Sequence, residues 1–260
     1  MRAGSVVDVT CLTTGAVRPK EGERGIRRYL PGGWRSDTLP VHVYLVRHPE
    51  GACLFDTGQS ARAAGPGYFP RWYPFFRLAR FELEPQDEAA PQLARLGLDP
   101  EDLRWIVLSH MHTDHAGGLA GLAGTEVVVS RIEWTRAVGW SGRLRGYLPQ
   151  YWPAHTTPRL VDFDGPPIGP FPGSFALTRD RALVLVPTPG HTPGHMSLLV
   201  DGAYLLAGDL CESADRLEYA NPPLARYCRD EQLAVLTAHD PEAPARIRDR
   251  DDRREPEPAR

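Results

Sequence analysis

Leu108-Ser109-His110-Met111-His112-Thr113-Asp114-His115 is the stretch that decides the fold of this 260-residue chain. It holds three imidazoles and one carboxylate within six residues, although histidine occurs only nine times in the sequence. In an extended segment residues i and i+2 project to the same side, so His110 and His112 can bind one ion. If a helix then begins at Asp114, that carboxylate and His115 point to a second position nearby. The spacing therefore suits two adjacent metals better than one. Four ligand-type side chains in six residues at a strand end argue against a solvated or core-packed set of histidines.

Three later segments also carry metal-ligand side chains. The run Thr188-Pro189-Gly190-His191-Thr192-Pro193-Gly194-His195 places two histidines in a loop braced by Gly and Pro, and two apolar strands run into Asp209 and His239. Each cluster follows a predicted strand, so one edge of the sheets can gather all of them. A mixed nitrogen and oxygen ligand set is typical of catalytic rather than structural zinc, and it also tolerates iron, cobalt and manganese.

The apolar pattern predicts an α/β architecture with two layered sheets rather than a doubly wound parallel sheet. We expect strands over residues 6–12, 41–46, 52–55, 105–108, 125–130, 175–177, 183–186, 197–200, 203–206 and 233–236, and helices over 86–96 and from 131 to 136. Residues 14–40 are rich in Gly, Arg and Pro and are expected to be loop. One domain is predicted over residues 1–240, followed by a charged, disordered tail over 241–260.

Composition excludes several classes of protein. The net charge of −3, from 33 acidic and 30 basic residues, predicts binding neither to nucleic acid nor to a membrane. The four cysteines form no CxxC pair, which argues against a disulfide framework and a sulfur-ligated zinc site. Because no secretory leader pattern or membrane-length apolar run is seen, we expect a cytoplasmic enzyme.

Residues 68–76 contain six aromatics in nine positions, interrupted by prolines. One interpretation is a wall or lid for an apolar substrate, with Phe69, Trp72 and Phe75 as contacts. Equal weight goes to a loop folded onto the core or to a contact in a homodimer.

Taken together, these motifs resemble the metallo-β-lactamase superfamily, from Asp56-Thr57-Gly58 to His239. The resemblance implies a four-layer αββα sandwich with mixed sheets and two divalent metal ions, Zn²⁺ first, with Fe, Co or Mn as alternatives. It also implies a ligand set of His110, His112 and His195 for one metal, Asp114, His115 and His239 for the other, and Asp209 bridging both. His191 is then expected to brace its loop.

Within the superfamily, residues 109–118 and 191–195 are most similar to the N-acyl homoserine lactonases, which implies hydrolysis of a lactone or carboxylic ester. Metal coordination lowers the pKa of bound water to roughly 7, so a hydroxide bridging two metals would attack the carbonyl carbon. Asp114 is a candidate to relay the proton to the leaving group, in addition to binding metal.

Two departures from this branch keep alternatives open. Glu212, a candidate substrate contact, stands where these lactonases commonly have a tyrosine that assists at the substrate carbonyl. Only the 29 residues 210–238 separate Asp209 from His239, fewer than is usual in the branch. The alternatives are a thioesterase like glyoxalase II or another hydrolase of this fold, and a metal-binding protein with impaired activity.

Overall fold

A computed structural model describes residues 7–20, 33–70, 78–154 and 156–252. Two β-sheets lie at its centre, in the strand orders β4-β1-β2-β3-β5-β6-β7 and β12-β11-β10-β9-β8. The first contains β1 (Asp8–Pro19), β2 (Leu39–Arg47), β3 (Ala52–Phe55), β4 (Ala79–Glu82), β5 (Leu103–Val107), β6 (Glu126–Ser130) and β7 (Arg159–Val161). The second contains β8 (Phe175–Ala176), β9 (Leu183–Pro187), β10 (Met196–Val200), β11 (Tyr204–Gly208) and β12 (Ala234–Thr237).

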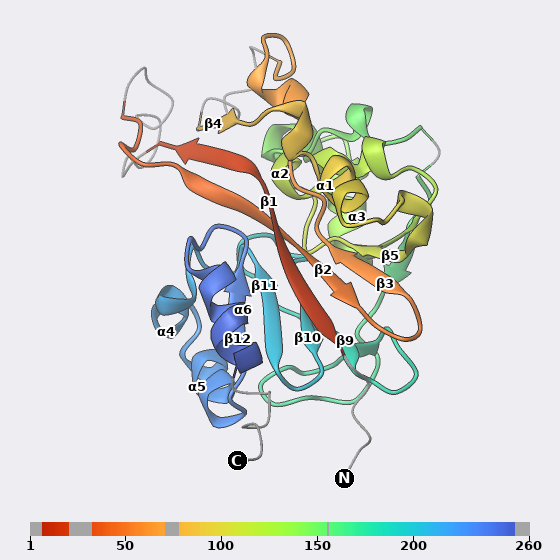
Figure 1. Ribbon diagram of the computed structural model, residues 1–260, viewed down its shortest axis with the longest axis vertical. Helices are drawn as coiled ribbons and strands as arrows, with labels where there is room; N and C mark the ends of the chain where they lie inside the picture. Colours follow the sequence, from red (N-terminus) through yellow and green to blue (C-terminus); the bar gives the residue numbers. More distant parts are fainter. Residues whose placement is uncertain (1–6, 21–32, 71–77, 155, 253–260) are drawn as a thin grey trace.

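Helices cover the outer sides of the two sheets (Figure 1). The α-helices are α1 (Ala89–Arg95), α2 (Thr113–Ala116), α3 (Arg131–Val138), α4 (Leu217–Ala220), α5 (Pro222–Asp230) and α6 (Ala243–Asp252). Short 3₁₀ helices span Ala61–Ala64, Pro85–Asp87, Pro100–Asp102, Gly117–Leu122, Gly142–Arg145, Pro149–Tyr151 and Ala214–Arg216. Helices α1, α2 and α3 lie toward one side of the sandwich, and α4, α5 and α6 toward the other.

Three apolar clusters hold these layers together. The central one joins the inner faces of the sheets, with Phe55 and Val107 from one sheet packed among Leu198 and Leu206 from the other. A second cluster lies between the seven-stranded sheet and α1, and a third packs α5 on the five-stranded sheet. This arrangement confirms the predicted four-layer αββα sandwich with mixed sheets.

Strand direction places the ligand segments together. Strands β3, β5, β6 and β7 are parallel neighbours. Strands β9 and β11 each pair antiparallel with β10, and β11 is parallel to β12, so β9, β11 and β12 run in one direction. Backbone hydrogen bonds from Met196 to Ser109 and from His42 to Ala238 join the sheets where these strands end. One edge of the sandwich therefore collects the segments after β3, β5, β9, β11 and β12.

Strands β4 and β7 and helices α4 and α5 were not expected from the sequence, and β1 is longer than expected. Residues 14–40 were expected to be loop, but strand β1 continues to Pro19. It can do so because Gly15 adopts a φ of +84° at a register shift between Thr13 and Ala16. A Cβ at Gly15 would lie 2.3 Å from Leu83 Cβ, so the close approach of the segment that follows β4 also requires glycine here.

The tail prediction for residues 241–260 is wrong for residues 243–252, which form α6. Ala243 and Ile247 are buried in the central cluster, and Tyr204 donates a hydrogen bond of 2.6 Å to Asp251. The apolar positions lie one helical turn apart, so a mostly charged segment still has an apolar side to bury. Residues 253–260 lie outside the described residues. None of the helices in the described ranges is long and apolar enough to cross a membrane.

Candidate metal centre

The segment after β5 supplies the first ligands. Residue His112 has an extended backbone (φ −62°, ψ 159°), and α2 begins at the next residue, Thr113. The chain thus changes from extended to helical inside the motif, as its spacing predicts, which separates His110 and His112 from Asp114 and His115. Residue His110 is fully buried at the sheet edge.

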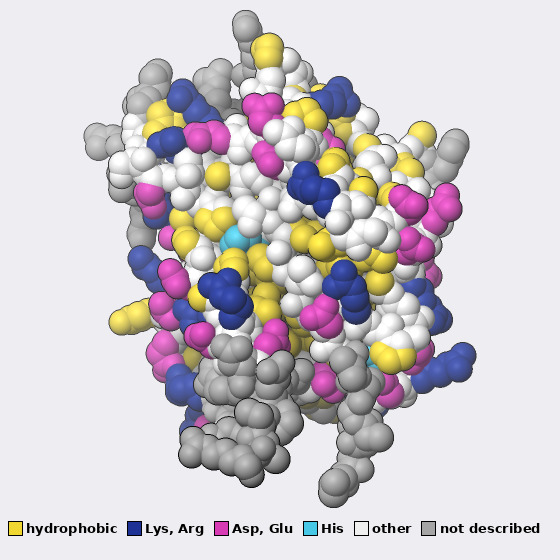
Figure 2. Space-filling model, in the orientation of Figure 1, with side chains coloured by type: hydrophobic (Ala, Val, Ile, Leu, Met, Phe, Trp, Pro, Cys, Tyr) yellow, Lys and Arg dark blue, Asp and Glu magenta, His cyan; other side chains and the backbone are white. Residues whose placement is uncertain are grey.

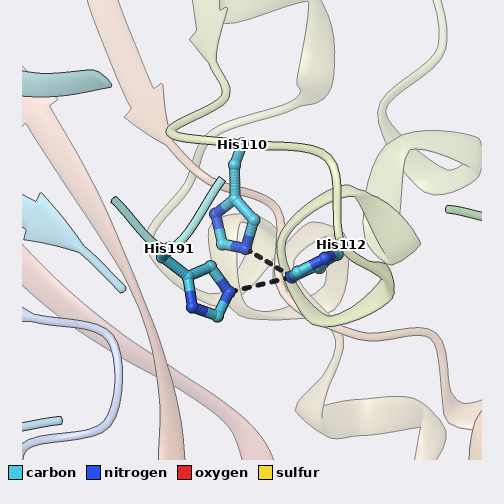
Figure 3. A group of neighbouring side chains, drawn as sticks. All are labelled: His110, His112 and His191. Atoms are coloured by element: carbon cyan, nitrogen blue, oxygen red, sulfur yellow. Dashed lines mark hydrogen bonds between the residues drawn. The ribbon is translucent and has the colours of Figure 1, made fainter. Parts of the chain in front are cut away.

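Three imidazoles meet on one side of the centre and are called here the nitrogen triad (Figure 3). In the triad, His112 Nδ1 lies 3.0 Å from His110 Nε2 and 2.9 Å from His191 Nε2. The triad can supply ligand atoms that all lie within 4.8 Å of one another. Residue His191 comes from the loop after β9, so the triad is assembled from both sheets.

The other side of the centre combines carboxylates and imidazoles. Asp209 Oδ1 lies 3.2 Å from His115 Nε2 and 3.3 Å from His239 Nε2, while Asp114 Oδ2 lies 3.7 Å from His239 Nε2. The second oxygen of Asp209, Oδ2, faces the triad at 3.4 Å from His191 Nε2 and 3.9 Å from His110 Nε2. Asp209 therefore faces both ligand groups, and the short segment before His239 still brings that ring to the centre.

The structure places His191, rather than His195, beside His110 and His112, although His195 was expected to bind metal and His191 to brace its loop. His195 is buried, with Nδ1 2.8 Å from Thr188 Oγ1 and Nε2 accepting the backbone N–H of Asp209 at 3.2 Å. Both ring nitrogens are therefore occupied by the protein. The backbone N–H of Thr188 donates to the carbonyl of His195 and closes the loop. His195 therefore lies at the base of the loop, whereas His191 lies farther out, at the triad. That hairpin geometry was the signal that could have identified His191.

Asp56 directly follows β3 and was not predicted to be a site residue. Its buried carboxylate accepts hydrogen bonds from Ser109 N (2.7 Å), Ser109 Oγ (2.8 Å) and His115 Nδ1 (2.8 Å). Asp56 has a φ of +62°, a conformation that Asp adopts more readily than most residues. It thereby orients His115, leaving Nε2 free to face Asp209.

Burial and charge set the protonation of these rings. Burial lowers the pKa of His112 to about 3 and holds the pKa of His110 well below its ordinary value. Burial also opposes protonation of His239, but the Asp209 carboxylate outweighs it and raises the pKa of His239 to about 9. Although burial would raise the pKa of Asp209, His115 and His239 hold it well below its ordinary range. His110 and His112 are thus neutral and Asp209 is ionised, which are the states that bind cations.

The donor set fits divalent metal ions. His115 Nε2 and Asp209 Oδ1 are buried atoms, and neither has a hydrogen-bond partner within the described ranges. Buried polar atoms are nearly always satisfied, so two facing atoms without hydrogen bonds indicate that a ligand such as a cation completes them. Imidazole nitrogens with carboxylate oxygens suit zinc and its neighbours.

A cavity of about 720 Å³ opens over the centre. Its walls are largely apolar, and Phe69 and Glu212, both expected from the sequence to contact substrate, line it. Trp72 and Phe75 lie outside the described residues. The face drawn in Figure 2 carries acidic and basic side chains interspersed, with hydrophobic side chains between them. Such a surface agrees with the weak net charge.

An αββα sandwich with His and Asp clusters at its strand ends defines a class of metal-dependent hydrolases. The model of the metallo-beta-lactamase superfamily matches residues 36–253 of the chain. The chain belongs to this superfamily, which confirms the resemblance and the assignment as a hydrolase.

Two curated relatives are N-acyl homoserine lactonases. The chain is 28% identical to the N-acyl homoserine lactonase AttM of Rhizobium radiobacter, over 79% of this chain and 83% of the relative. It is 31% identical to an N-acyl homoserine lactonase of a Bacillus species, over 76% and 73%. A solved N-acyl homoserine lactone hydrolase, with the product N-hexanoyl-L-homoserine at its catalytic metal centre, has a TM-score of 0.68 at 22% identity, covering 90% and 93%. The dizinc lactonase AidC has a TM-score of 0.61 at 17% identity, covering 91% and 88%.

Proposed function

We propose that this protein is a lactonase that opens the ring of N-acyl homoserine lactones with two bound divalent metal ions. The observation that carries the proposal is Asp209, which faces both ligand groups in the lining of a mostly apolar cavity. A lactone carbonyl needs polar chemistry at one end of the site, and its acyl chain needs apolar walls at the other. The names of the curated relatives support this substrate class.

The residues divide between the two ions. The nitrogen triad would hold one, Asp114, His115 and His239 the other, and Asp209 would contact both. When bound, such ions supply Lewis acidity and an activated water at neutral pH, with Zn²⁺ the first candidate. This assignment replaces His195 with His191 and keeps the other six residues predicted from the sequence.

The chain's own groups would orient the substrate and move the proton. Asp114 lines the cavity beside His239, so it can accept a proton from the attacking water and deliver it to the leaving alkoxide. The apolar walls, including Phe69 and Phe81, would receive the acyl chain. Both carboxylate oxygens of Glu212 lie 3.0 Å from Arg35 Nη1, so Glu212 would shape the cavity lining as part of an ion pair.

One experiment separates this proposal from the alternatives. Zinc-loaded protein is given N-hexanoyl homoserine lactone or an acyl-glutathione thioester, and acid release is followed. We expect lactone hydrolysis to exceed thioester hydrolysis and to fall at least about 100-fold in Asp209→Ala. Asp162→Ala, which removes an exposed carboxylate paired with Arg131, is the matched control and should keep the wild-type rate.

Faster thioester turnover would indicate a thioesterase, and full metal content without hydrolysis would indicate a metal-binding protein with impaired activity. Either result rejects the lactonase proposal. The distances from His239 to Asp209 and Asp114 support an intact second ligand group, which removes the reason for expecting impairment. A homodimer and a cytoplasmic location stay predictions.

A further inference from the structure

Glu133 is a buried carboxylate outside both ligand groups. It lies in the first turn of α3 and is fully buried, and the ion pairs found among the described residues do not include it. Burying a carboxylate without a cation costs several kcal/mol unless hydrogen bonds compensate. The hydrogen bonds that Glu133 makes therefore indicate why a carboxylate is buried at this position.

Both carboxylate oxygens accept hydrogen bonds from the segments that carry the nitrogen triad. Glu133 Oε1 accepts the backbone N–H of Met111 at 3.1 Å, and Oε2 accepts the Thr192 hydroxyl at 2.8 Å. Met111 lies between His110 and His112, and Thr192 directly follows His191. One side chain thus joins the segment after β5 to the loop after β9, close to all three imidazoles.

Two further contacts connect the surroundings of Glu133 to the segments of the triad. A Cβ at Gly194 would lie 2.2 Å from Glu133 N, so the loop that carries His191 lies directly against the start of α3. The ring of Tyr147 stacks on His112 with centroids 5.3 Å apart. Burial, and beyond it the neighbouring Glu133 carboxylate, raises the pKa of Tyr147. Each segment that bears or supports a triad ring is therefore in contact with Glu133.

We infer that Glu133 is the positioning residue of the nitrogen triad, which fixes His191 relative to His110 and His112 and so sets the affinity of the metal held there. The inference rests on the proposed two-metal function. A carboxylate suits this role because it accepts two hydrogen bonds at once, whereas a glutamine can accept from Met111 but not from the Thr192 hydroxyl through its amide nitrogen.

The test compares cobalt binding by wild type, Thr192→Val, Glu133→Gln and Glu133→Ala. Cobalt affinity is measured by competition with a chelator, and the cobalt absorption spectrum reports the ligand geometry. We expect Thr192→Val and Glu133→Gln to weaken one of the two equivalents by about 10–100-fold, with a changed absorption spectrum and the other equivalent retained. Glu133→Ala should lose more than Glu133→Gln, because the glutamine keeps the hydrogen bond to Met111.

Thr178→Val is the matched control. Thr178 is also a buried threonine, and its hydroxyl donates to a carboxylate, Asp180, at 2.7 Å. This variant should bind both equivalents like wild type. If Glu133→Ala fails to fold, Thr192→Val decides the matter, because it leaves the carboxylate in place.

Three outcomes would overturn the inference. The first is wild-type affinity and spectrum in both Thr192→Val and Glu133→Gln. The second is an equal weakening of both metal equivalents in Thr192→Val and Glu133→Gln, or a loss of affinity in Thr178→Val as large as in those two variants. Either result would indicate general destabilisation. The third is a wild-type protein that binds no metal, which rejects the proposed function as well. A wild type with two metals and unaffected variants rejects only the role of Glu133.

Discussion

His191 and His195 lie four residues apart in one loop, yet their surroundings differ sharply. The His191 side chain is 35% exposed beside the triad, whereas both nitrogens of buried His195 contact the protein. His191→Ala should therefore fold like wild type and bind one metal equivalent less. His195→Ala should keep its triad but lose about 1–3 kcal/mol of unfolding free energy, because the Asp209 N–H loses its acceptor. Metal analysis and urea unfolding of both variants check this, and the reverse pattern would restore His195 as the ligand.

Asp56 acts on the metal centre through His115. Replacing it by asparagine keeps a residue that tolerates positive φ but substitutes an amide for one of the two acceptor oxygens shared by Ser109 and His115. We expect Asp56→Asn to weaken metal binding by about 10–100-fold, measured by chelator competition. Asp201→Asn is the control, because Asp201 also has positive φ (+49°) but lies in the hairpin turn between β10 and β11. Equal losses in the two variants would assign the effect to the turn conformation.

At the scale of helices and strands, the features that could be predicted are those encoded by residues close together in the sequence. Six adjacent residues predicted the change from strand to helix around His112, and the apolar runs predicted β5, β9 and β11. The role of Asp56 could not be predicted, because its partner His115 lies 59 positions away. Choosing His191 over His195 required the hairpin geometry of the loop, which the residue types alone do not specify.

The segment between Asp209 and His239 shows the same limit. Its 29 residues are fewer than is usual in the lactonase branch, yet α4 and α5 fit within them. The sequence does carry a local signal for α5: Asn221 accepts the N–H of Leu224 as an N-cap, and Pro222 follows at the first helical position. The structure places His239 beside Asp209 because α5 packs on the sheet and returns the chain directly into β12.

Helix α6 contributes to stability through Ile247, which packs in the central cluster although most of its neighbours in sequence are charged. Ile247→Ala should lower the unfolding free energy by about 2–4 kcal/mol, because it leaves a cavity beneath the helix. Arg248→Ala changes an exposed residue of the same helix and should stay within about 0.5 kcal/mol of wild type. Urea unfolding measures both. Equal stabilities of the two variants would mean that α6 does not pack on the core in solution.

At the scale of the whole molecule, His42 lies where the two sheets contact each other. This buried side chain of β2 donates from Nε2 to the carbonyl of Asp240 beyond β12, at 3.1 Å, while Nδ1 accepts from the Thr13 hydroxyl at 3.1 Å. The contact with Thr13 requires the neutral ring, because only an unprotonated Nδ1 can accept from the hydroxyl. Burial lowers the pKa of His42 to about 4, from its ordinary value of 6.5. As the pH falls from 6.5 to 4, the unfolded chain therefore binds a proton that the folded protein excludes, and stability decreases.

This linkage is testable by measuring unfolding free energy at pH 7 and pH 5. His42→Gln is expected to be less stable than wild type at pH 7, because it loses well-formed hydrogen bonds. Between pH 7 and pH 5 the gap should shrink by about 2 kcal/mol, at about 1.36 kcal/mol per pH unit below 6.5, because only the wild type carries this cost of deprotonation. Thr13→Val loses a hydroxyl but keeps the ring, so its gap from wild type should stay constant. If the stability difference between His42→Gln and wild type were also constant, the folded protein would not exclude the proton from His42. The contact between the two sheets at His42 would then open under mild acid.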